Sequence, residues 1–236
     1  MANERLPAQS EPAIEAVLKK LEDDDRQVVL AALKRAERTE AELRYLADHD
    51  SLTGLLDRRR FRAELDQYVS FSARYGGRGA VMIVDIDGLK GVNDSLGHHA
   101  GDNLIRQVAE VMRERVRGTD IVARLSGDEF AILMPQTDVE GAMQLGEDLR
   151  SQVAESVHPT SDSAPATISV GITMFGGSEK GAEAVLVAAD QAMYTAKEGG
   201  RNQIALFRDP GEPQRDPERR QTTAARIRDA ITGDRL

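Results

Sequence analysis

The sequence has no cysteine among its 236 residues. Without cysteine the protein has neither a disulfide framework nor a zinc site built from thiolates, so its stability must come from packing. Any bound metal must then be held by oxygen or imidazole ligands. Such ligands favour Mg²⁺ or a similar hard cation.

Long apolar runs are also missing from the chain. No stretch reaches the ~20 residues that a membrane-spanning helix needs, and residues 1–12 lack the apolar region of a signal peptide. We therefore expect a cytoplasmic protein with no membrane segment in this chain. The net charge of -9 at pH 7 argues against a nucleic-acid partner, because a phosphate backbone attracts positively charged surfaces.

The composition divides the chain into three parts. We expect a helical dimerisation segment at residues 1–48, a compact domain at 49–208, and a linker rich in Pro, Arg, Asp and Glu at 209–236. The first part is either one amphipathic helix that lies on its own domain or a short parallel coiled coil, with the acidic run at 22–25 marking a break. Its weak seam, with alternating spacings of three and four, consists of Val29, Ala32, Ala36, Thr39, Leu43 and Leu46.

The middle part alternates helical and strand patterns. We expect helices at about residues 57–73, 93–116, 138–153 and 181–200, strands at 80–87, 165–175 and 203–207, and a hairpin at 121–134. Alternation of this kind with an inserted hairpin predicts an α/β (α+β) fold, in which a mixed sheet is flanked by helices.

The expected hairpin carries two adjacent carboxylates, Asp128 and Glu129, at its turn. Its strands are short and nearly continuous in apolar residues, which is typical of strands covered on both faces. Ser126 and Gly127 supply the turn. Two negative charges so close repel unless a cation or a proton lies between them. A solvated Asp-Glu turn is the common alternative, so a metal site needs support from a second acidic position.

That second position is at the end of the strand at 80–87. Asp85 and Asp87 are one residue apart, so they lie on the same face. Central strands of such a sheet are commonly neighbours, and we therefore expect Asp85 to converge with Asp128 and Glu129. Carboxylates together with substrate phosphates are the usual ligands of Mg²⁺.

Basic residues and glycines complete the pattern. Lys197 and Arg201 are four apart at a helix end, so we expect them to project on one side with charge suited to a polyphosphate. Gly88 and Gly91 loosen the backbone and let N–H groups approach a phosphate. A metal site, a cluster of acidic side chains and a set of phosphate-binding groups together indicate nucleotidyl transfer.

Four motifs, in the same order, resemble those of the GGDEF family of diguanylate cyclases over about residues 49–207. They read DSLTGLLDRRRF, VDIDGLKGVNDSLGHHAGD, RLSGDEF and AMYTAKEGGRN. The resemblance implies a fold like the palm of adenylyl cyclases and polymerases. It also implies a dimeric, Mg²⁺- or Mn²⁺-dependent enzyme that joins two GTP molecules into cyclic di-GMP with release of two pyrophosphates. Asp57 stands where the family usually has asparagine, and Ser126 replaces the first glycine of the signature.

The resemblance assigns roles position by position. The metal ligands would be Asp85, the main-chain carbonyl of Ile86, Asp128 and Glu129, with Asp128 also the candidate for activating the ribose 3′-hydroxyl. The phosphates would be held by the N–H groups of Gly88 and Leu89 and by Lys90, Lys197 and Arg201. The guanine edge would bind Asn93 and Asp102. Outside the site, Arg124 and Asp50 would form a structural ion pair, and His98 and His99 would be helix-entry residues.

Arg117 and Asp120 precede the signature at the interval of the family's RxxD inhibitory motif. This implies that the product, cyclic di-GMP, binds there as a feedback ligand. A guanidinium can offer forked donors to a guanine or a phosphate, and a carboxylate can accept from a guanine N–H. Ordinary loop charge is the alternative interpretation of this common pattern.

Two questions stay open from the sequence. If position 126 requires a positive φ, serine costs roughly 1 kcal/mol or more; if it only requires a small residue, serine costs little. The domain is accordingly either an active cyclase or a catalytically silent domain that binds GTP or cyclic di-GMP and regulates an attached phosphodiesterase or a partner. Residues 226–231 resemble the lead-in helix of an EAL phosphodiesterase domain, or form a short tail of no special role.

Overall fold

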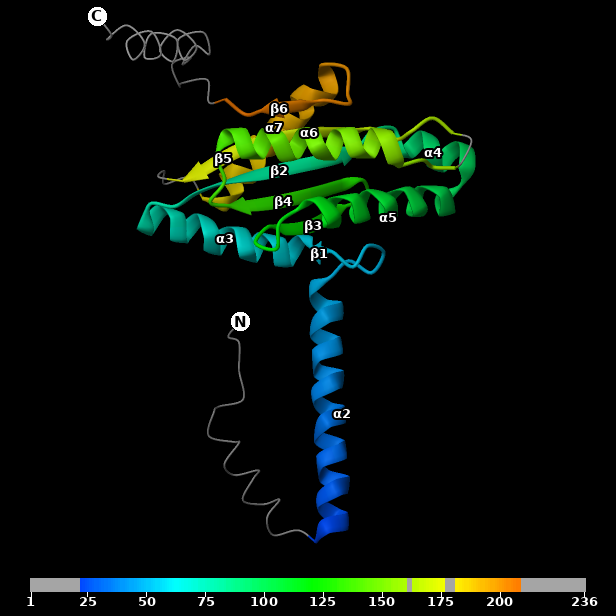
Figure 1. Cartoon of the computed structure of the whole chain (residues 1–236), viewed down its shortest axis with the longest axis vertical. Coiled ribbons are helices and arrows are strands. Elements are labelled where there is room, and N and C mark those ends of the chain that lie inside the picture. Colours follow the sequence, from blue (N-terminus) through cyan, green and yellow to red (C-terminus); the bar gives the residue numbers. More distant parts are fainter. Residues whose placement is uncertain (1–21, 161–162, 177–180, 209–236) are drawn as a thin grey trace, which may run out of the picture.

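The computed structural model describes residues 22–160, 163–176 and 181–208. Six strands form one mixed sheet in the order β1-β3-β4-β2-β5-β6 (Figure 1). The strands are β1 (Leu56–Asp57), β2 (Arg78–Ile86), β3 (Ile121–Ser126), β4 (Glu129–Pro135), β5 (Ile168–Gly176) and β6 (Ile204–Leu206). The helices are α2 (Asp23–Asp48), α3 (Arg58–Tyr75), α4 (Leu89–Leu96), α5 (His98–Arg115), α6 (Val139–Ser156) and α7 (Ala182–Glu198). The predicted mixed sheet flanked by helices is confirmed.

Strand β2 is the centre of the sheet. It pairs antiparallel with β4 on one side and with β5 on the other, and every residue of β2 after Arg78 is buried. The outer pairs, β1 with β3 and β5 with β6, are parallel. Because both faces of β2 are covered, its sequence is a continuous apolar run rather than an alternating one.

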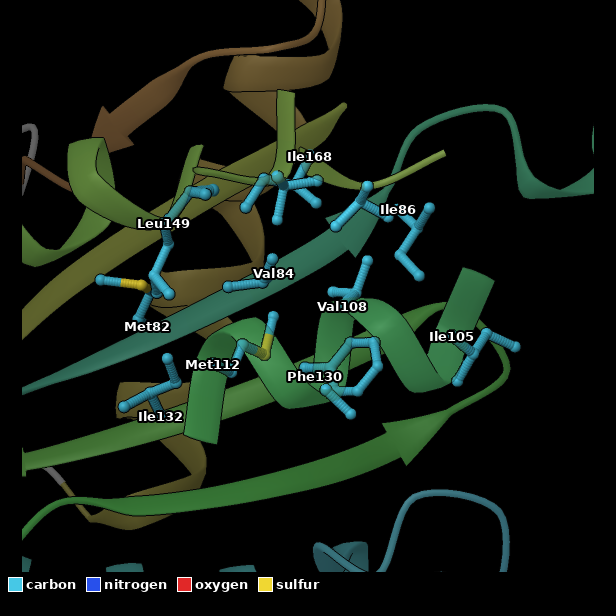
Figure 2. Close-up of a cluster of buried hydrophobic side chains, with 14 of the residues drawn as sticks. Met82, Val84, Ile86, Ile105, Val108, Met112, Phe130, Ile132, Leu149 and Ile168 are labelled. Carbon is cyan, nitrogen blue, oxygen red and sulfur yellow. The ribbon is translucent and has the colours of Figure 1, made fainter. Parts of the chain in front are cut away.

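Two pairs of helices cover the two faces of the sheet. Met82 and Val84 of β2 belong to the same buried cluster as residues of α5 and α6, and Figure 2 shows Met82 beside Leu149 of α6 and Val84 on the side of Val108 of α5. Val81 and Ile83 belong to a second cluster with residues of α3 and α7. Since side chains alternate along a strand, Asp85 lies on the face that α3 and α7 cover.

Aspartates start two of the predicted helices. Asp57 accepts a hydrogen bond from the Arg60 N–H at 2.6 Å, and Asp138 accepts one from the Gly141 N–H at 2.9 Å. Aspartate and asparagine are about equally good at this position. The replacement of the usual asparagine by Asp57 therefore keeps the cap of α3.

The region after β2 differs from the prediction. The sequence predicts a polar turn and one helix at 93–116, whereas the chain enters α4 at Leu89 and breaks at Gly97 before α5. Gly88 and Gly97 have φ of 72° and 84°, which residues with a side chain rarely adopt. These two glycines make the sharp turns, and the predicted loosening at Gly91 is wrong because Gly91 lies inside α4.

Helix α2 stands away from the sheet and its covering helices (Figure 1). It has no buried residue, and Leu43 and Leu46 of the predicted seam are 62% and 63% exposed. The interpretation of this segment as a helix that lies on its own domain is therefore wrong. Helix α2 begins at this acidic run: Glu22 is extended and Asp23–Asp25 form the first turn, where negative charge stabilises the helix dipole. The residues on the other side of the predicted break lie outside the described ranges.

No helix in the described ranges is both long enough and apolar enough to span a membrane. The linker predicted at 209–236, with its EAL-like stretch, lies outside the described residues, as does the part of the first segment before residue 22.

Candidate active site

Asp85 lies near the end of β2 and is only 4% exposed. In the sheet register it is opposite Glu129 on β4 and Ser169 on β5. The Ile86 N–H donates to the Asp128 carbonyl at 3.1 Å, so the turn of the β3-β4 hairpin is fixed to the end of β2. The acidic hairpin therefore lies beside the strand of Asp85, as predicted. The predicted convergence of the Asp85, Asp128 and Glu129 carboxylates on one metal position is not found among the described residues.

The charge on Asp85 is held in an unfavourable environment. Burial, together with the negative charges of Asp128 and Asp87, raises the pKa of the Asp85 carboxyl to about 6 against the opposing effect of Lys197. The Lys197 Nζ lies 2.7 Å from Asp85 Oδ2. A cation is therefore already part of this site, and Lys197 supplies it.

A divalent cation fits this site in combination with a phosphate. The described residues contain no group of three or more acidic or histidine side chains that is close enough to hold a metal ion. Asp85 interacts electrostatically with Asp128, but the Glu129 carboxylate accepts a hydrogen bond from Ser126 Oγ at 2.7 Å. Because Mg²⁺ usually takes one or two carboxylates plus substrate phosphates, these residues suit an ion that arrives with a nucleotide.

The hairpin turn accommodates Ser126 without strain. Ser126 pairs with Glu129, and a bulge at Leu125 interrupts the β3-β4 register. Positive φ values at non-glycine residues of the described chain occur only at Gln136, Arg201 and Asn202. The backbone at position 126 is therefore not left-handed, and serine carries no strain there.

Arg124 connects this turn to the segment after α2. Its guanidinium donates to the Gly127 carbonyl at 2.8 Å and to Asp50 Oδ1 at 3.1 Å. Asp50 also accepts from the N–H and the hydroxyl of Thr53, at 2.9 and 2.7 Å. The predicted ion pair of Arg124 and Asp50 is confirmed, and it holds the tip of the hairpin.

The start of α4 offers N–H groups beside the acids. Gly88 occupies the cap position, and no side chain caps the helix. The first N–H groups of a helix have no partner inside it and carry partial positive charge. The N–H groups predicted to hold phosphate, those of Gly88 and Leu89, are at this position, and Lys90 is exposed beside them.

Lys197 and Arg201 do not share a helix. Helix α7 ends at Glu198, and Arg201 lies in the following loop with φ of 63°. The predicted four-residue helical spacing is therefore wrong, because Gly199 and Gly200 end the helix first. The Asn202 N–H donates to Asp87 Oδ2 at 3.1 Å, which keeps this loop at the acidic end of the sheet.

The two residues predicted to bind guanine lie on adjacent helices. Asn93 is on α4, and its side chain lies against buried Gly101 on α5, where an added Cβ would collide with the Asn93 amide. Asp102 follows Gly101 and is half-buried, as is Asn93. Gly101 was missed from the sequence, although a glycine inside a helical pattern is a signal of close packing.

The predicted inhibitory pair forms a tight turn. The Asp120 N–H donates to the Arg117 carbonyl at 2.9 Å, and Asp120 Oδ2 accepts from the Arg117 N–H at 3.0 Å. Asp120 thus has a local structural role, while the Arg117 side chain is exposed.

The fold and the charges at this end of the sheet define an α+β domain with the groups of a nucleotidyl-transfer site. A sequence profile described as "Diguanylate cyclase, GGDEF domain" matches residues 47–203. This chain therefore belongs to the GGDEF family, and the predicted membership is confirmed.

Named relatives are similar over the same region. Diguanylate cyclase DgcP of Pseudomonas aeruginosa is 42% identical over 158 residues, which are 66% of this chain and 23% of DgcP. The cyclic di-GMP phosphodiesterase NbdA of the same species is 36% identical over 180 residues, which are 76% of this chain and 23% of NbdA. The chain thus spans 23% of the length of each of these curated relatives.

A solved structure is similar in fold as well. It is the crystal structure of the coiled coil and GGDEF domain of DgcB from Caulobacter crescentus in complex with c-di-GMP. The TM-score is 0.72 at 28% identity, over 78% of this chain and 98% of that one.

Proposed function

We propose that this protein is a diguanylate cyclase that condenses two GTP molecules into cyclic di-GMP with release of two pyrophosphates, dependent on Mg²⁺ or Mn²⁺. The observation that carries the proposal is the buried Asp85 in the central strand, beside the Asp128 turn and balanced by Lys197. Such an arrangement has a place for a cation and for the phosphates that come with it.

Metal ligands in this proposal are Asp85, the Ile86 carbonyl, Asp128 and Glu129. A cation held there would supply positive charge to the triphosphate. Lys197 then moves from Asp85 to a phosphate oxygen, where it joins Lys90, Arg201 and the N–H groups of Gly88 and Leu89. Asp128 accepts the proton of the ribose 3′-hydroxyl while that oxygen attacks the α-phosphorus of the second GTP and the bond to pyrophosphate breaks.

Guanine selection belongs to Asn93 and Asp102. The Asp102 carboxylate accepts from the guanine ring N–H and amino group, neither of which adenine offers on that edge. Because Gly101 lets α4 pack closely on α5, the two side chains are held near each other before the base arrives.

The reaction requires two copies of the chain. Each domain presents one GTP, and the two 3′-hydroxyls attack across the interface between the domains. In this proposal residues 1–48 are the dimerisation segment, residues 49–208 the catalytic domain, and residues 209–236 a linker.

Mass spectrometry of the products after incubation with GTP and Mg²⁺ tests the activity. The wild type should form cyclic di-GMP at concentrations where it is dimeric. Asp128→Asn should lose turnover but still bind GTP, and Asp66→Asn, a matched change at an exposed position of α3, should keep turnover. No product from dimeric wild type would refute the cyclase.

A silent, nucleotide-binding domain is the second candidate. It is favoured by the hydrogen bond that Ser126 makes to Glu129, because this contact engages a proposed metal ligand. The similarity to NbdA, which is named as a phosphodiesterase, points the same way. Calorimetric binding of GTP without any product would favour this candidate.

Feedback by cyclic di-GMP is proposed at Arg117 and Asp120. The exposed Arg117 guanidinium binds the ligand, and the bound product holds two domains in an arrangement that keeps their GTP sites apart. Arg117→Ala should keep the initial velocity and abolish the slowing as product accumulates, whereas Arg106→Ala, an exposed control on α5, should keep the slowing. Equal inhibition of wild type and Arg117→Ala by added cyclic di-GMP would place the site elsewhere.

A further inference from the structure

Two consecutive non-glycine residues after α7 have left-handed backbone. Arg201 has φ of 63° and Asn202 has φ of 48°. A side chain makes this conformation unfavourable for arginine, whereas asparagine adopts it more readily, so at Arg201 it persists where surrounding contacts impose it. The first of these residues is the one proposed to bind phosphate, and the structure shows what imposes the bend.

One restraint is the hydrogen bond from the Arg201 N–H to the Ala196 carbonyl of α7 at 3.1 Å. Another is the carboxylate of Asp87, which the proposed mechanism does not use. Asp87 Oδ2 accepts from the Asn202 N–H at 3.1 Å and from Thr167 Oγ1 at 2.8 Å. Asp87 Oδ1 accepts from Ser169 Oγ at 2.7 Å. The Asp87 N–H donates to the Thr167 carbonyl at 2.9 Å. This residue is therefore fixed to β5 and its lead-in segment and connects them to the loop after α7.

A third restraint acts on the other side of the bend. Arg150 of α6 donates to Asn202 Oδ1 at 3.1 Å, and the Arg150 guanidinium is itself held by Glu147, with its Nε 2.9 Å from Glu147 Oε2. Asn202 is thus bound through its backbone on one side and its side chain on the other. More than one contact therefore holds the left-handed backbone of residues 201–202, as is expected where a strained conformation persists at a functional site.

We propose that Asp87 is a positioning residue for Arg201: by holding the Asn202 N–H, it fixes the left-handed bend that keeps Arg201 over the phosphates of GTP. The inference rests on the proposed function in one respect, the binding of GTP phosphate by Arg201. Asp87 itself touches neither nucleotide nor metal in this role.

Substitutions of Asp87 separate this role from a general structural one. Asp87→Ala removes the acceptor of the Asn202 N–H. In Asp87→Asn the amide oxygen takes the place of Oδ2, and the amide NH₂ donates to the Ser169 hydroxyl, so the bend is kept. Ser169→Ala is the matched control, because it removes a hydrogen bond of Asp87 without affecting Asn202.

The affinity for 3′-deoxy-GTP with Mg²⁺, measured by calorimetry, is the main readout, since this nucleotide lacks the attacking hydroxyl and is not consumed. Asp87→Ala should weaken nucleotide binding about ten-fold, because a displaced Arg201 loses its hydrogen bond to the phosphate, and a hydrogen bond to a charged group is worth about that much. Asp87→Asn and Ser169→Ala should stay within about two-fold of wild type. In the Arg201→Ala background, Asp87→Ala should have no further effect.

Hydrogen exchange of the Asn202 amide gives a readout without nucleotide. It should be faster in Asp87→Ala and unchanged in Asp87→Asn. If Asp87→Ala does not fold, Asn202→Val and Asn202→Gly replace it, because valine is excluded from φ of 48° and glycine is not. The valine variant should then lose affinity in an Arg201-dependent way, and the glycine variant should keep most of it.

Three results would overturn the inference. They are additive effects of Asp87→Ala and Arg201→Ala, a lower melting temperature with unchanged nucleotide affinity, and a wild type that does not bind 3′-deoxy-GTP. A wild type that binds 3′-deoxy-GTP but makes no cyclic di-GMP from GTP would refute the proposed cyclase activity and not the role of Asp87. The nucleotide affinities of Asp87→Ala, Arg201→Ala and the double variant would still test that role.

Discussion

Ser126 stands where the family's signature usually has its first glycine. Its position is a strand end with no positive φ, and its hydroxyl donates to the Glu129 carboxylate at 2.7 Å. Serine therefore adds a hydrogen bond there without a backbone penalty. The acidic pair of the signature, Asp128 and Glu129, is unchanged.

Reversion to glycine tests this interpretation of Ser126. Ser126→Gly should lower the free energy of unfolding by about 0.5–1 kcal/mol, because glycine loses more backbone entropy on folding and the hydrogen bond is lost. Urea unfolding measures the change. Gly127→Ala is the control with the opposite sign: an added Cβ meets nothing within 4 Å, so it should stabilise by about 0.4–1 kcal/mol. Stabilisation by Ser126→Gly would instead reveal a left-handed requirement.

Asp50 gives the fold a dependence on pH. Burial opposes its ionisation, but hydrogen bonds from Thr53 and Arg124 outweigh burial and lower the pKa of this carboxyl from its ordinary value of 3.8. The carboxylate therefore contributes stability that is present above the unfolded pKa and is lost as the pH falls through the folded pKa.

Asp50→Asn should accordingly destabilise the protein at neutral pH and have little effect in acid. We expect roughly 1 kcal/mol at pH 7, since the ion pair is partly exposed. Below pH 3.8 the difference in the free energy of unfolding between Asp50→Asn and wild type should shrink towards zero. Thermal unfolding across pH measures it, with Asp190→Asn on the exposed face of α7 as the control. A difference that is the same at every pH would disprove the ionic contribution.

At the scale of elements, the contact of α7 with β5 decides where Lys197 lies. A Cβ at Gly171 of β5 would collide with the Met193 N and the Ala189 O of α7, so the helix backbone rests directly on the strand. Lys197 is four residues after Met193, about one turn further along the helix. Its 2.7 Å contact with Asp85 therefore depends on the absence of a side chain at position 171.

Gly171→Ala should affect both stability and the site. Overpacking of a tight interface costs about 1–3 kcal/mol, and displacement of α7 should weaken GTP binding by moving Lys197. Urea unfolding and calorimetry measure the two effects. Gly91→Ala, an exposed helix position with nothing within 4 Å, is the control for stability and should not destabilise. A Gly171→Ala variant with wild-type stability would contradict the close approach.

The sequence predicted most elements because their patterns are local. The apolar run of β2, the hairpin and the helices that start near Asp57 and Asp138 each follow from neighbouring residues. The start of α4 was missed because Gly88 was interpreted as a source of flexibility, whereas its positive φ makes a defined turn.

The predicted site was less complete for a physical reason. The left-handed bend at Arg201 depends on contacts with Asp87, which is far away in the sequence, so a helical spacing was assumed in its place. Lys197 was predicted to bind phosphate because the sequence gives its positive charge. The sequence does not show that this side chain contacts Asp85. The roles of the individual site residues remain predictions.

At the scale of the whole molecule, α2 is a rod with a fixed attachment. Arg59 of α3 donates to the Ala47 carbonyl at 2.6 Å and to Asp48 Oδ1 at 2.5 Å, and the rings of Tyr45 and His49 stack at 3.9 Å. The two Arg59 contacts hold the end of α2 against α3, and the ring stack lies between α2 and its own cap residue His49. If two α2 helices pair, their geometry therefore sets the separation of the two catalytic domains.

The exposed seam of α2 predicts how activity depends on concentration. In the proposed dimer a second copy covers Leu43 and Leu46, because these leucines repeat at the spacing of a coiled coil and are 62% and 63% exposed in the single chain. Replacing both by lysine should weaken the dimer, so specific activity should fall more steeply on dilution than in the wild type, and deletion of residues 1–45 should do the same.

Sedimentation and product formation across a dilution series measure this effect. Glu37→Lys is the matched control, since it changes the net charge by the same amount as the double variant but lies next to the seam and not in it. It should keep the wild-type dilution curve. If the double lysine variant, the deletion and the wild type all show equal activity per mole at every dilution, α2 does not dimerise the enzyme, and the two GTP sites must meet through the catalytic domains alone.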